Sequence, residues 1–395
     1  MTSEWRTIRA ADFIDFNPRL SLKKGDIATK VAMDKLKPFT KKIPETEKAE
    51  FNGGAKFCNG DTVMARITPC LENGKTAYVD MLDDGEIGFG STEFIVMRAK
   101  TGISDPQFVY YTAINPVFRN VAIKSMVGSS GRQRVQQSVL EELELSVPDL
   151  DEQGRIGDFL ARIDEKIALN DRINDNLYAQ AKATTKQWIS KSTGDYELLP
   201  LSDIASINPD TYSPKEAWKY VNYLDTSSIT EGCIAEIQHI TPSSEKLPSR
   251  ARRKIAPNDI VFSTVRPNQR HYGIISEPLP NMLGSTGFAV IRSKNPLVCN
   301  ELIYLCLTEN EFIEKMQQLA EQSTSTFPSI KPSDLGVCEI PCPKNQSSTS
   351  FTETLKSLFA LIAANQRENI SLSEIRDALL PKLMSGEINV SAVQL

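Results

Sequence analysis

The sequence predicts a duplicated α/β (α+β) protein in which two globular domains are each followed by a long helix. The two helices are expected to pair as an antiparallel coiled coil with pseudo-twofold symmetry. Three observations predict this fold. Short motifs recur in the same order about 191–195 residues apart. Each copy begins with short β-rich runs between Gly, Pro and Asn turns, and each ends with an apolar repeat of helical period.

The recurring motifs divide the chain into two copies. The matched segments are Asn17-Pro18 with Asn208-Pro209, Gly90-Ser91-Thr92 with Gly284-Ser285-Thr286, and Asn170-x-Arg172-x-Asn174 with Asn365-x-Arg367-x-Asn369. A coincidence of turn residues is the alternative, but the matches keep their order along the whole chain. We therefore expect domains at 1–148 and 193–343, and long helices within 149–192 and 344–395.

The first part of each copy is expected to contain short strands. The β-rich runs are 62–67, 94–98, 260–265 and 288–292. Asn-Gly and Pro-Asn turns precede Asp61 and Asp259, so these acids are interpreted as turn-forming residues rather than catalytic acids.

The second part of each copy carries the pattern of a paired helix. Asp149 or Asp151 can cap the first helix, and the second is expected to end around Ser385-Gly386. Apolar residues repeat in steps of three and four, and each seam contains two asparagines: Asn170 and Asn174, then Asn365 and Asn369. Antiparallel pairing predicts that Asn170 faces Asn369 and Asn174 faces Asn365, whereas the alternative places them on a solvated face.

The helices also suggest why the chain is duplicated. About 40 helical residues form a rod of roughly 60 Å. Such a rod could hold two similar domains at a fixed distance, as is needed to read two half-sites on one DNA duplex.

Composition describes an ordinary globular protein whose charge is unevenly distributed. The net charge is −5, but residues 141–175 hold eleven acids and four bases, whereas 249–271 hold six bases and one acid. The overall charge therefore does not exclude nucleic acid as a partner. The seven scattered cysteines, and the absence of a signal peptide or long apolar run, indicate a cytoplasmic protein with reduced thiols. Cys338 and Cys342 lack a zinc spacing, so no metal is expected.

Motifs of catalysis are missing from the sequence. It contains no phosphate-binding loop of the G-x-x-x-x-G-K-[S/T] type and no strand–G-x-G-x-x-G–helix unit, and it has only two histidines. Glu72-x-x-Lys75 vaguely resembles a nuclease cluster but does not recur in the second copy. We expect a chain that is not an enzyme and holds no cofactor of its own.

Side chains suited to DNA concentrate in a few loops. Arg and Gln can form bidentate contacts with guanine and adenine, and hydroxyl and amide groups can contact bases or phosphates. A solvated surface is the alternative for each residue. The candidates are Arg66, Lys75, Arg132, Gln133, Arg134, Arg252, Arg253, Lys254, Arg266, Asn268, Gln269, Arg270, His271, Ser323, Thr324 and Thr326.

At these residues the sequence resembles the specificity (S) subunits of type I restriction–modification enzymes. The motifs are Asp61-Thr-Val-Met-Ala-Arg-Ile-Thr-Pro-Cys-Leu-Glu-Asn-Gly-Lys75, Gly90-Ser-Thr-Glu-Phe94, Val147-Pro-x-x-Asp-Glu-Gln153 and Ile163-Asp-Glu-Lys-Ile167 followed by Asn170-x-Arg-x-Asn174. The resemblance covers nearly the whole chain. It is weaker in the second copy, where the strand after Asp259 lacks the Thr-Pro-Cys-Leu-Glu-Asn-Gly run.

The resemblance implies a function that the residues alone do not specify. Each target-recognition domain would read one half of a bipartite DNA site, and the helices would set the spacer and dock two modification (methyltransferase) subunits. Restriction subunits would add translocation and cleavage. S-adenosylmethionine, ATP and Mg²⁺ would be held by those partners only. The alternatives are a coiled-coil adaptor without DNA contact and a stand-alone DNA methyltransferase or nuclease.

Overall fold

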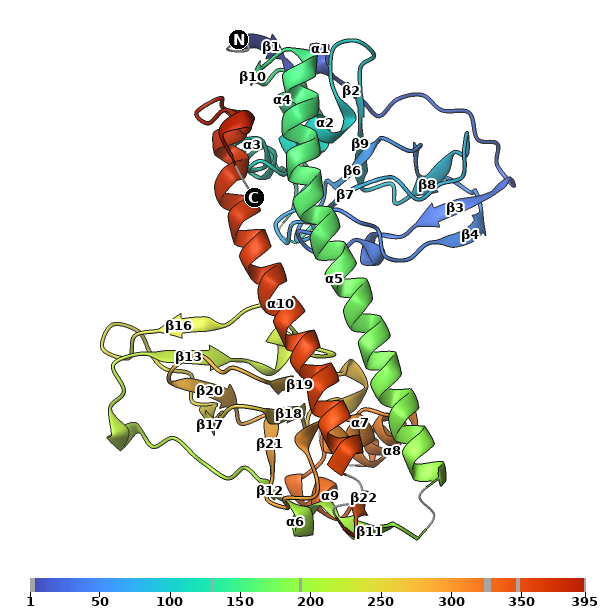
Figure 1. The fold of residues 1–395 in the computed structure, drawn as a ribbon. Coiled ribbons are helices and arrows are strands. Elements are labelled where there is room, and N and C mark those ends of the chain that lie inside the picture. Colours follow the sequence, from blue (N-terminus) through green and yellow to red (C-terminus); the bar gives the residue numbers. More distant parts are fainter. Residues whose placement is uncertain (1–3, 130, 192–193, 323–327, 346–348, 394–395) are drawn as a thin grey trace. The chain divides into compact units, whose positions relative to one another are not determined.

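The computed structural model describes residues 4–129, 131–191, 194–322, 328–345 and 349–393. The two long helices are α5 (Leu150–Lys191) and α10 (Thr349–Met384). The chain forms two compact units: unit 1 is Met1–Asp171 with Gln366–Leu395, and unit 2 is Arg172–Asn365. Each long helix therefore supplies one segment to each unit (Figure 1). The division of the sequence into four consecutive segments stays a prediction.

Within its described residues, unit 1 has two four-stranded sheets and one strand pair. The sheet orders are β2–β9–β6–β7 and β4–β3–β8–β5, and β1 pairs with β10. All pairs are antiparallel except β3 and β8. The strands are β1 (Arg6–Arg9), β2 (Ile14–Phe16), β3 (Ile27–Val31), β4 (Glu47–Glu50), β5 (Ala55–Phe57), β6 (Thr62–Ala65), β7 (Thr76–Tyr78), β8 (Gly88–Gly90), β9 (Phe94–Ala99) and β10 (Glu144–Val147). The helices are α1 (Ala10–Phe13), α2 (Pro106–Ile114), α3 (Pro116–Lys124) and α4 (Gln137–Glu141).

Unit 2 repeats this topology. Its sheets are β12–β21–β18–β19 and β16–β13–β20–β17, β11 pairs with β22, and β13 and β20 form the parallel pair. A small β14–β15 hairpin is added. The strands are β11 (Tyr196–Pro200), β12 (Ala205–Ile207), β13 (Val221–Leu224), β14 (Ile229–Thr230), β15 (Cys233–Ile234), β16 (Gln238–Ile240), β17 (Ala251–Lys254), β18 (Asp259–Ser263), β19 (Tyr272–Ile275), β20 (Met282–Ser285), β21 (Phe288–Ser293) and β22 (Glu339–Pro343). The helices are α6 (Leu201–Ile204), α7 (Asn300–Leu307), α8 (Asn310–Glu321) and α9 (Pro332–Gly336).

The four predicted β-rich runs are the central strands of the two repeated sheets. They correspond to β6 and β9 in unit 1 and to β18 and β21 in unit 2, and each pair is hydrogen-bonded side by side. Their residues are buried on both faces, which explains the continuous apolar runs in the sequence. The run predicted as 62–67 ends at Ala65, because the chain then turns into a loop.

The repeated asparagines make the same turn in both units. Asn17 and Asn208 have left-handed backbones, with φ of 50° and 55°, a conformation that asparagine tolerates better than most residues. Asn17 N–H donates to the Val96 carbonyl at 2.7 Å, and its side-chain oxygen accepts from Val96 N–H at 2.9 Å. Asn208 makes the same two bonds with Val290, at 2.6 and 3.0 Å. The duplication thus extends to individual hydrogen bonds.

Asp61 and Asp259 are buried structural acids. Each accepts a backbone N–H from the residue three positions earlier, at 2.8 and 2.7 Å, as turn-forming residues do. Each carboxylate also accepts two hydrogen bonds from one arginine. Arg98 donates to Asp61 at 2.7 and 2.6 Å, and Arg292 donates to Asp259 at 2.7 and 2.8 Å. These contacts confirm the turn-forming role predicted from the sequence.

The segments of α5 and α10 are integral to the core of each unit. In unit 1, Ile156 and Leu160 of α5 share one apolar cluster with Leu380 and Leu383 of α10. In unit 2, Ala181 of α5 and residues Leu355 and Leu358 of α10 share another. Asp149 caps α5 by accepting the Glu152 N–H at 2.9 Å, and α10 ends at Met384, before Gly386 with φ of 74°.

Both predicted asparagine pairs form. In unit 1, the buried Asn170 amide donates to the Asn369 side-chain oxygen at 2.9 Å. In unit 2, Asn365 donates to Asn174 at 2.8 Å. The helix segments in each unit therefore run antiparallel in the predicted register, and the asparagines do not lie on a solvated face. Amides that satisfy one another in an apolar seam favour one register over others.

Unit 1 also buries a charged cluster that has no counterpart among the described residues of unit 2. Arg376 of α10 donates to Asp164 of α5 at 2.6 Å, and the Tyr111 hydroxyl donates to the same carboxylate at 2.5 Å. Lys41 contacts Tyr111 and Gln107. Burial lowers the pKa of Lys41 to about 8, although the nearby Asp164 carboxylate opposes this shift.

None of the described helices is long and apolar enough to cross a membrane. Among the described residues, no group of three or more His, Cys, Asp or Glu side chains could hold a metal ion.

Candidate nucleic-acid interface

Two candidate loops of unit 1 lie side by side, although 57 residues separate them in the sequence. Residues 66–69 follow β6, and residues 127–135 follow α3. The Val135 N–H donates to the Arg66 carbonyl at 2.8 Å, and the Thr68 N–H donates to the Gln133 carbonyl at 3.0 Å. The two loops therefore form one short antiparallel ribbon at the end of β6.

The ribbon presents two arginines in different states. Arg132 is exposed, and its guanidinium has no hydrogen-bond or ion-pair partner among the described residues. Arg134 is half-exposed and binds the Glu93 carboxylate, with contacts of 2.9 and 3.0 Å from Nε and 2.6 Å from Nη2. These hydrogen bonds hold the pKa of Glu93 below its ordinary value.

Beside the ribbon lies an open, polar cavity of about 600 Å³. Its lining includes three bases, Arg19, Lys56 and Arg66. The Lys56 amine donates to the Leu20 carbonyl at 2.9 Å, whereas the buried Arg66 Nε has no partner in the described part of the chain. A basic, open hollow of this kind is suited to a phosphate group.

Lys75 has a structural contact. Its amine donates to the Met33 carbonyl at 2.9 Å, and its side chain is only partly exposed. The structure gives Lys75 no place in the ribbon or the cavity lining.

Unit 2 builds the corresponding ribbon from the same backbone bonds. The Ile330 N–H donates to the Thr264 carbonyl, and the Arg266 N–H donates to the Pro328 carbonyl, both at 2.9 Å. By this register, Thr264 matches Arg66, and Ser329 matches Arg134. The hydroxyl-rich candidates Ser323, Thr324 and Thr326 lie outside the described residues.

The second-copy loop after β18 is folded around a short 3₁₀ helix, η4 (Pro267–Gln269). Asn268 and Gln269 have exposed side chains. Arg270 instead binds Glu231 at 3.1 Å and Asn310 at 2.9 Å. At one end of this loop, Arg266 is part of the ribbon. At the other end, His271 lies next to β14, and its Nδ1 is 2.7 Å from the Ile229 carbonyl oxygen. The amides of η4 are therefore the groups most available to a ligand.

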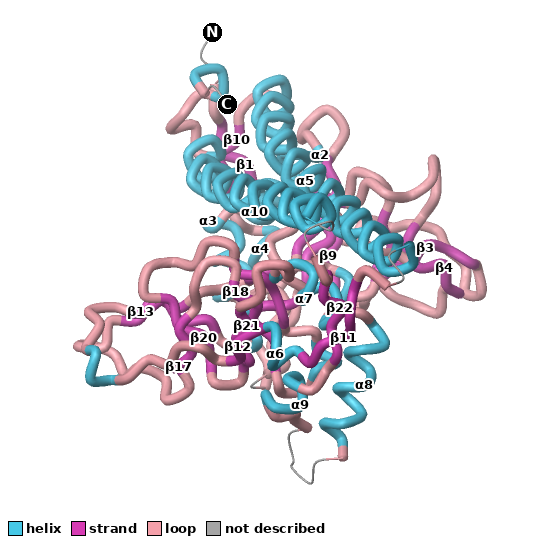
Figure 2. The backbone as a smooth tube through the Cα atoms, turned by 60° about the horizontal axis from the view of Figure 1, so that its bottom comes forward, coloured by secondary structure: helices cyan, strands magenta, loops and turns pink. Residues whose placement is uncertain are grey.

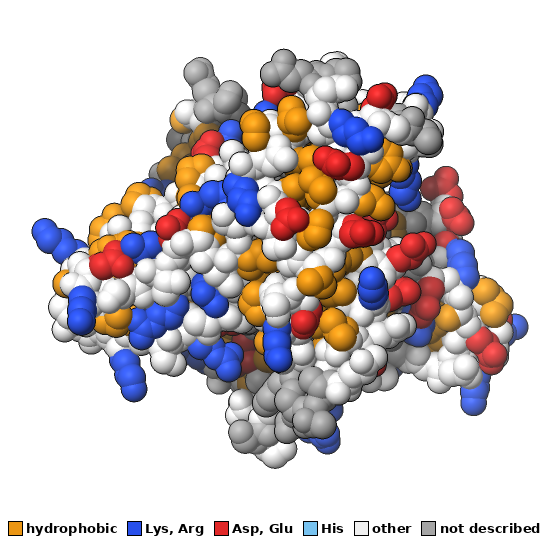
Figure 3. Space-filling view, turned by 90° about the horizontal axis from the view of Figure 1, so that it is seen from below, with side chains coloured by type: hydrophobic (Ala, Val, Ile, Leu, Met, Phe, Trp, Pro, Cys, Tyr) orange, Lys and Arg blue, Asp and Glu red, His pale blue; other side chains and the backbone are white. Residues whose placement is uncertain are grey.

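The basic run of β17 is partly occupied by contacts within unit 2. Lys254 pairs with Glu216 at 2.6 Å and lies over the Trp218 ring, and Arg252 donates to the Ser249 carbonyl at 3.2 Å. Burial lowers the pKa of Arg253, whose Nε has no partner among the described residues. Lys and Arg side chains gather on the left of Figure 3, where Figure 2 places β13, β17 and β20.

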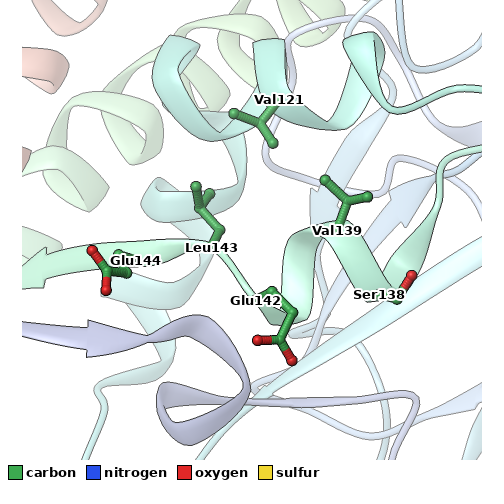
Figure 4. A pocket seen from close by; sticks show the side chains of 6 residues that line it. All are labelled: Val121, Ser138, Val139, Glu142, Leu143 and Glu144. Carbon is green, nitrogen blue, oxygen red and sulfur yellow. The ribbon is translucent and has the colours of Figure 1, made fainter.

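A second hollow in unit 1 has the opposite character. Val121, Val139 and Leu143 face it, and the carboxylates of Glu142 and Glu144 lie at its edge (Figure 4). Apolar walls with acidic neighbours are unsuited to a polyanion, so this hollow is not part of the candidate interface.

The carboxylates that bind the candidate arginines were not predicted from the sequence. Glu93 and Glu231 bind Arg134 and Arg270 across 41 and 39 residues. No spacing pattern reveals such a pair, because it depends on how distant loops meet. For the same reason, Arg19 and Lys56 of the polar cavity were not predicted, whereas Arg66 was.

The architecture defines the class of protein: a duplicated α+β chain with two long paired helices. A crystal structure of a type I restriction–modification S subunit from M. genitalium shares it, with a TM-score of 0.55 over 96% of both chains and 17% identity. In sequence, a family profile described as the type I restriction modification DNA specificity domain matches residues 3–179.

Curated relatives extend the similarity beyond the first copy. The HindI specificity subunit of Haemophilus influenzae is 22% identical, over 83% of this chain and 86% of the relative. The EcoAI specificity subunit of Escherichia coli is 35% identical over 121 residues, which cover 31% of this chain and 20% of the relative. The first copy of the chain therefore matches a DNA specificity domain, and the relatives that extend over more of its length are named as specificity subunits of type I restriction enzymes.

Proposed function

We propose that this chain is the DNA-sequence-specificity subunit of a type I restriction–modification system and reads a bipartite site with its two units. One observation carries this proposal: the two ribbons share their backbone hydrogen bonds but differ in their side chains. Arg134 and Glu93 of unit 1 match Ser329 and Gly287 of unit 2. A common frame with different base-facing groups is what two readers of different half-sites require.

The partners follow from the family and form part of the same proposal. Two modification subunits would bring S-adenosylmethionine for adenine methylation, and restriction subunits would bring ATP- and Mg²⁺-dependent cleavage. The chain itself would hold no cofactor and would act on chromosomal DNA in the cytoplasm. Its relatives are named as specificity subunits of restriction enzymes, which supports this assignment.

The proposal is tested by footprinting the chain together with its modification subunits on DNA methylated in cells that express the system. We expect two protected segments separated by an unprotected spacer. An absent footprint would favour a coiled-coil adaptor. Methylation or cleavage by the purified chain alone, supplied with S-adenosylmethionine and Mg²⁺, would make it an enzyme and refute the proposal.

Arg132→Ala is expected to alter recognition at one half-site only. Arg132 is exposed on the unit 1 ribbon, so we expect that losing its contact with a base weakens binding by about 1–3 kcal/mol. Binding to DNA libraries randomised in either half-site measures the effect. Gln269→Ala in unit 2 is the matched control and should affect the other half-site. Equal losses at both halves would contradict separate readers.

Shortening both helices is expected to shorten the spacer. Deleting seven facing residues from each of α5 and α10 removes two helical turns, about 10 Å, or about three base pairs. The seam stays in register because a heptad is one full repeat. Replacing the same heptads with others of equal length and the same seam residues is the control. An unchanged preferred spacer in a binding selection would disprove the idea that the helices set the gap.

A further inference from the structure

The contact between Arg134 and Glu93 leaves one edge of the guanidinium available. Nε and Nη2 face the carboxylate, and Nη1 has no partner among the described residues. Arg134 keeps 48% of its side chain exposed, compared with 22% for Glu93. The arginine is thus the more exposed member of the pair, and the carboxylate leaves its Nη1–Nη2 edge unoccupied.

Both members of the pair are fixed to the ribbon by their backbones. Arg134 forms bridges with Ile67 and Val127, and the Glu93 carbonyl accepts the Arg66 N–H at 2.8 Å. The carboxylate then sets the plane of the guanidinium. An arginine held in this way loses little side-chain entropy when it binds a planar ligand.

The charge of the pair favours a base over a phosphate. Hydrogen bonds from Arg134 lower the pKa of Glu93, so the carboxylate stays ionised at neutral pH and compensates the arginine charge. A compensated cation adds little to the non-specific attraction of phosphates. Its open edge still offers two parallel N–H groups, which match the O6 and N7 acceptors of guanine.

We propose that Arg134 reads a guanine in the half-site of unit 1 through its Nη1–Nη2 edge, and that Glu93 is the positioning residue. This inference rests on the proposed function. Ser329 and Gly287 occupy the matching positions of unit 2, so the same contact is not made in the other half-site.

The test uses the chain with its modification subunits and a DNA library randomised across both half-sites. Arg134→Lys keeps the charge but loses the two-pronged edge, and it should reduce the preference for one guanine by about 10- to 100-fold. Glu93→Gln should also weaken this preference. The Glu93 variant should also bind non-specific DNA more tightly, because the arginine charge is no longer compensated. The affinity should then fall more steeply with salt concentration, by the amount that about one additional phosphate contact produces. A purely structural role would not produce this gain.

Ser329→Ala is the control and should leave the guanine preference unchanged. Equal weakening for all sequences in Arg134→Lys, with base preferences intact, would identify a phosphate contact and overturn the inference. An unchanged preference in both unit 1 variants would overturn it too. If the unmodified complex selects no sequence at all, the proposed function itself fails, which is a separate outcome.

Discussion

Arg376→Ala is expected to destabilise unit 1 by about 3–5 kcal/mol. The Arg376 and Asp164 side chains are only 7% and 5% exposed, and their closest atoms are 2.6 Å apart. Removing the arginine leaves a carboxylate in an apolar core, with the Tyr111 hydroxyl as a remaining donor. The Lys41 amine is hydrogen-bonded to Gln107 and Tyr111 and not to this carboxylate, so we do not expect it to replace the lost ion pair. Urea unfolding, with hydrogen exchange to locate the effect, measures the loss.

The duplication supplies a control for this substitution. At the matching positions of unit 2, Phe359 replaces Asp164 and Ala181 replaces Arg376, and both pack in an apolar core. The double variant Asp164→Phe with Arg376→Ala should therefore recover part of the loss, because a buried ion pair can be replaced by packed apolar residues. Arg162→Ala, at an exposed position of α5, should change stability by less than about 0.5 kcal/mol. A single Arg376 variant as stable as the Arg162 variant would show that the ion pair is not stabilising.

The paired helices could be predicted because their information is local. The apolar seam has a fixed period, and equal spacing of the asparagines in both copies determines which residues face each other in an antiparallel pair. Asn170 with Asn369, and Asn174 with Asn365, confirm that register. The central strands could be predicted for a similar reason, since runs such as β6 are apolar on both faces.

The candidate site could be predicted only in part. The sequence identified both loops of the unit 1 ribbon but gave no reason to join them, because the bonds between Arg66 and Val135 cross 69 residues. The sequence also did not show which Arg and Lys side chains are already paired with acids. The structure shows that Arg134, Lys254 and Arg270 each bind a carboxylate. Such pairs depend on tertiary folding, which carries no signal in residue spacing.

Asp61→Ala and Asp259→Ala are expected to destabilise different units by different amounts. Asp61 is 1% exposed and is the only carboxylate bound to Arg98 among the described residues. Its loss also leaves a turn N–H without its acceptor. We therefore expect the free energy of unfolding of unit 1 to fall by about 3–5 kcal/mol. Asp259 is fully buried too, but its partner Arg292 keeps a second carboxylate, Asp210, at 2.9 Å. The loss in unit 2 should therefore be smaller.

Hydrogen exchange of peptides from β6 and β18 measures both losses in one experiment. In Asp61→Ala, the opening free energy should fall mainly in β6, and in Asp259→Ala mainly in β18. The double variant Asp210→Ala with Asp259→Ala removes both partners of Arg292 and should bring the loss in unit 2 up to that of Asp61→Ala in unit 1. Equal losses from the two single variants would show that Asp210, which is 51% exposed, is too well solvated to stabilise Arg292. A second carboxylate would then not explain the difference between two otherwise matched sites.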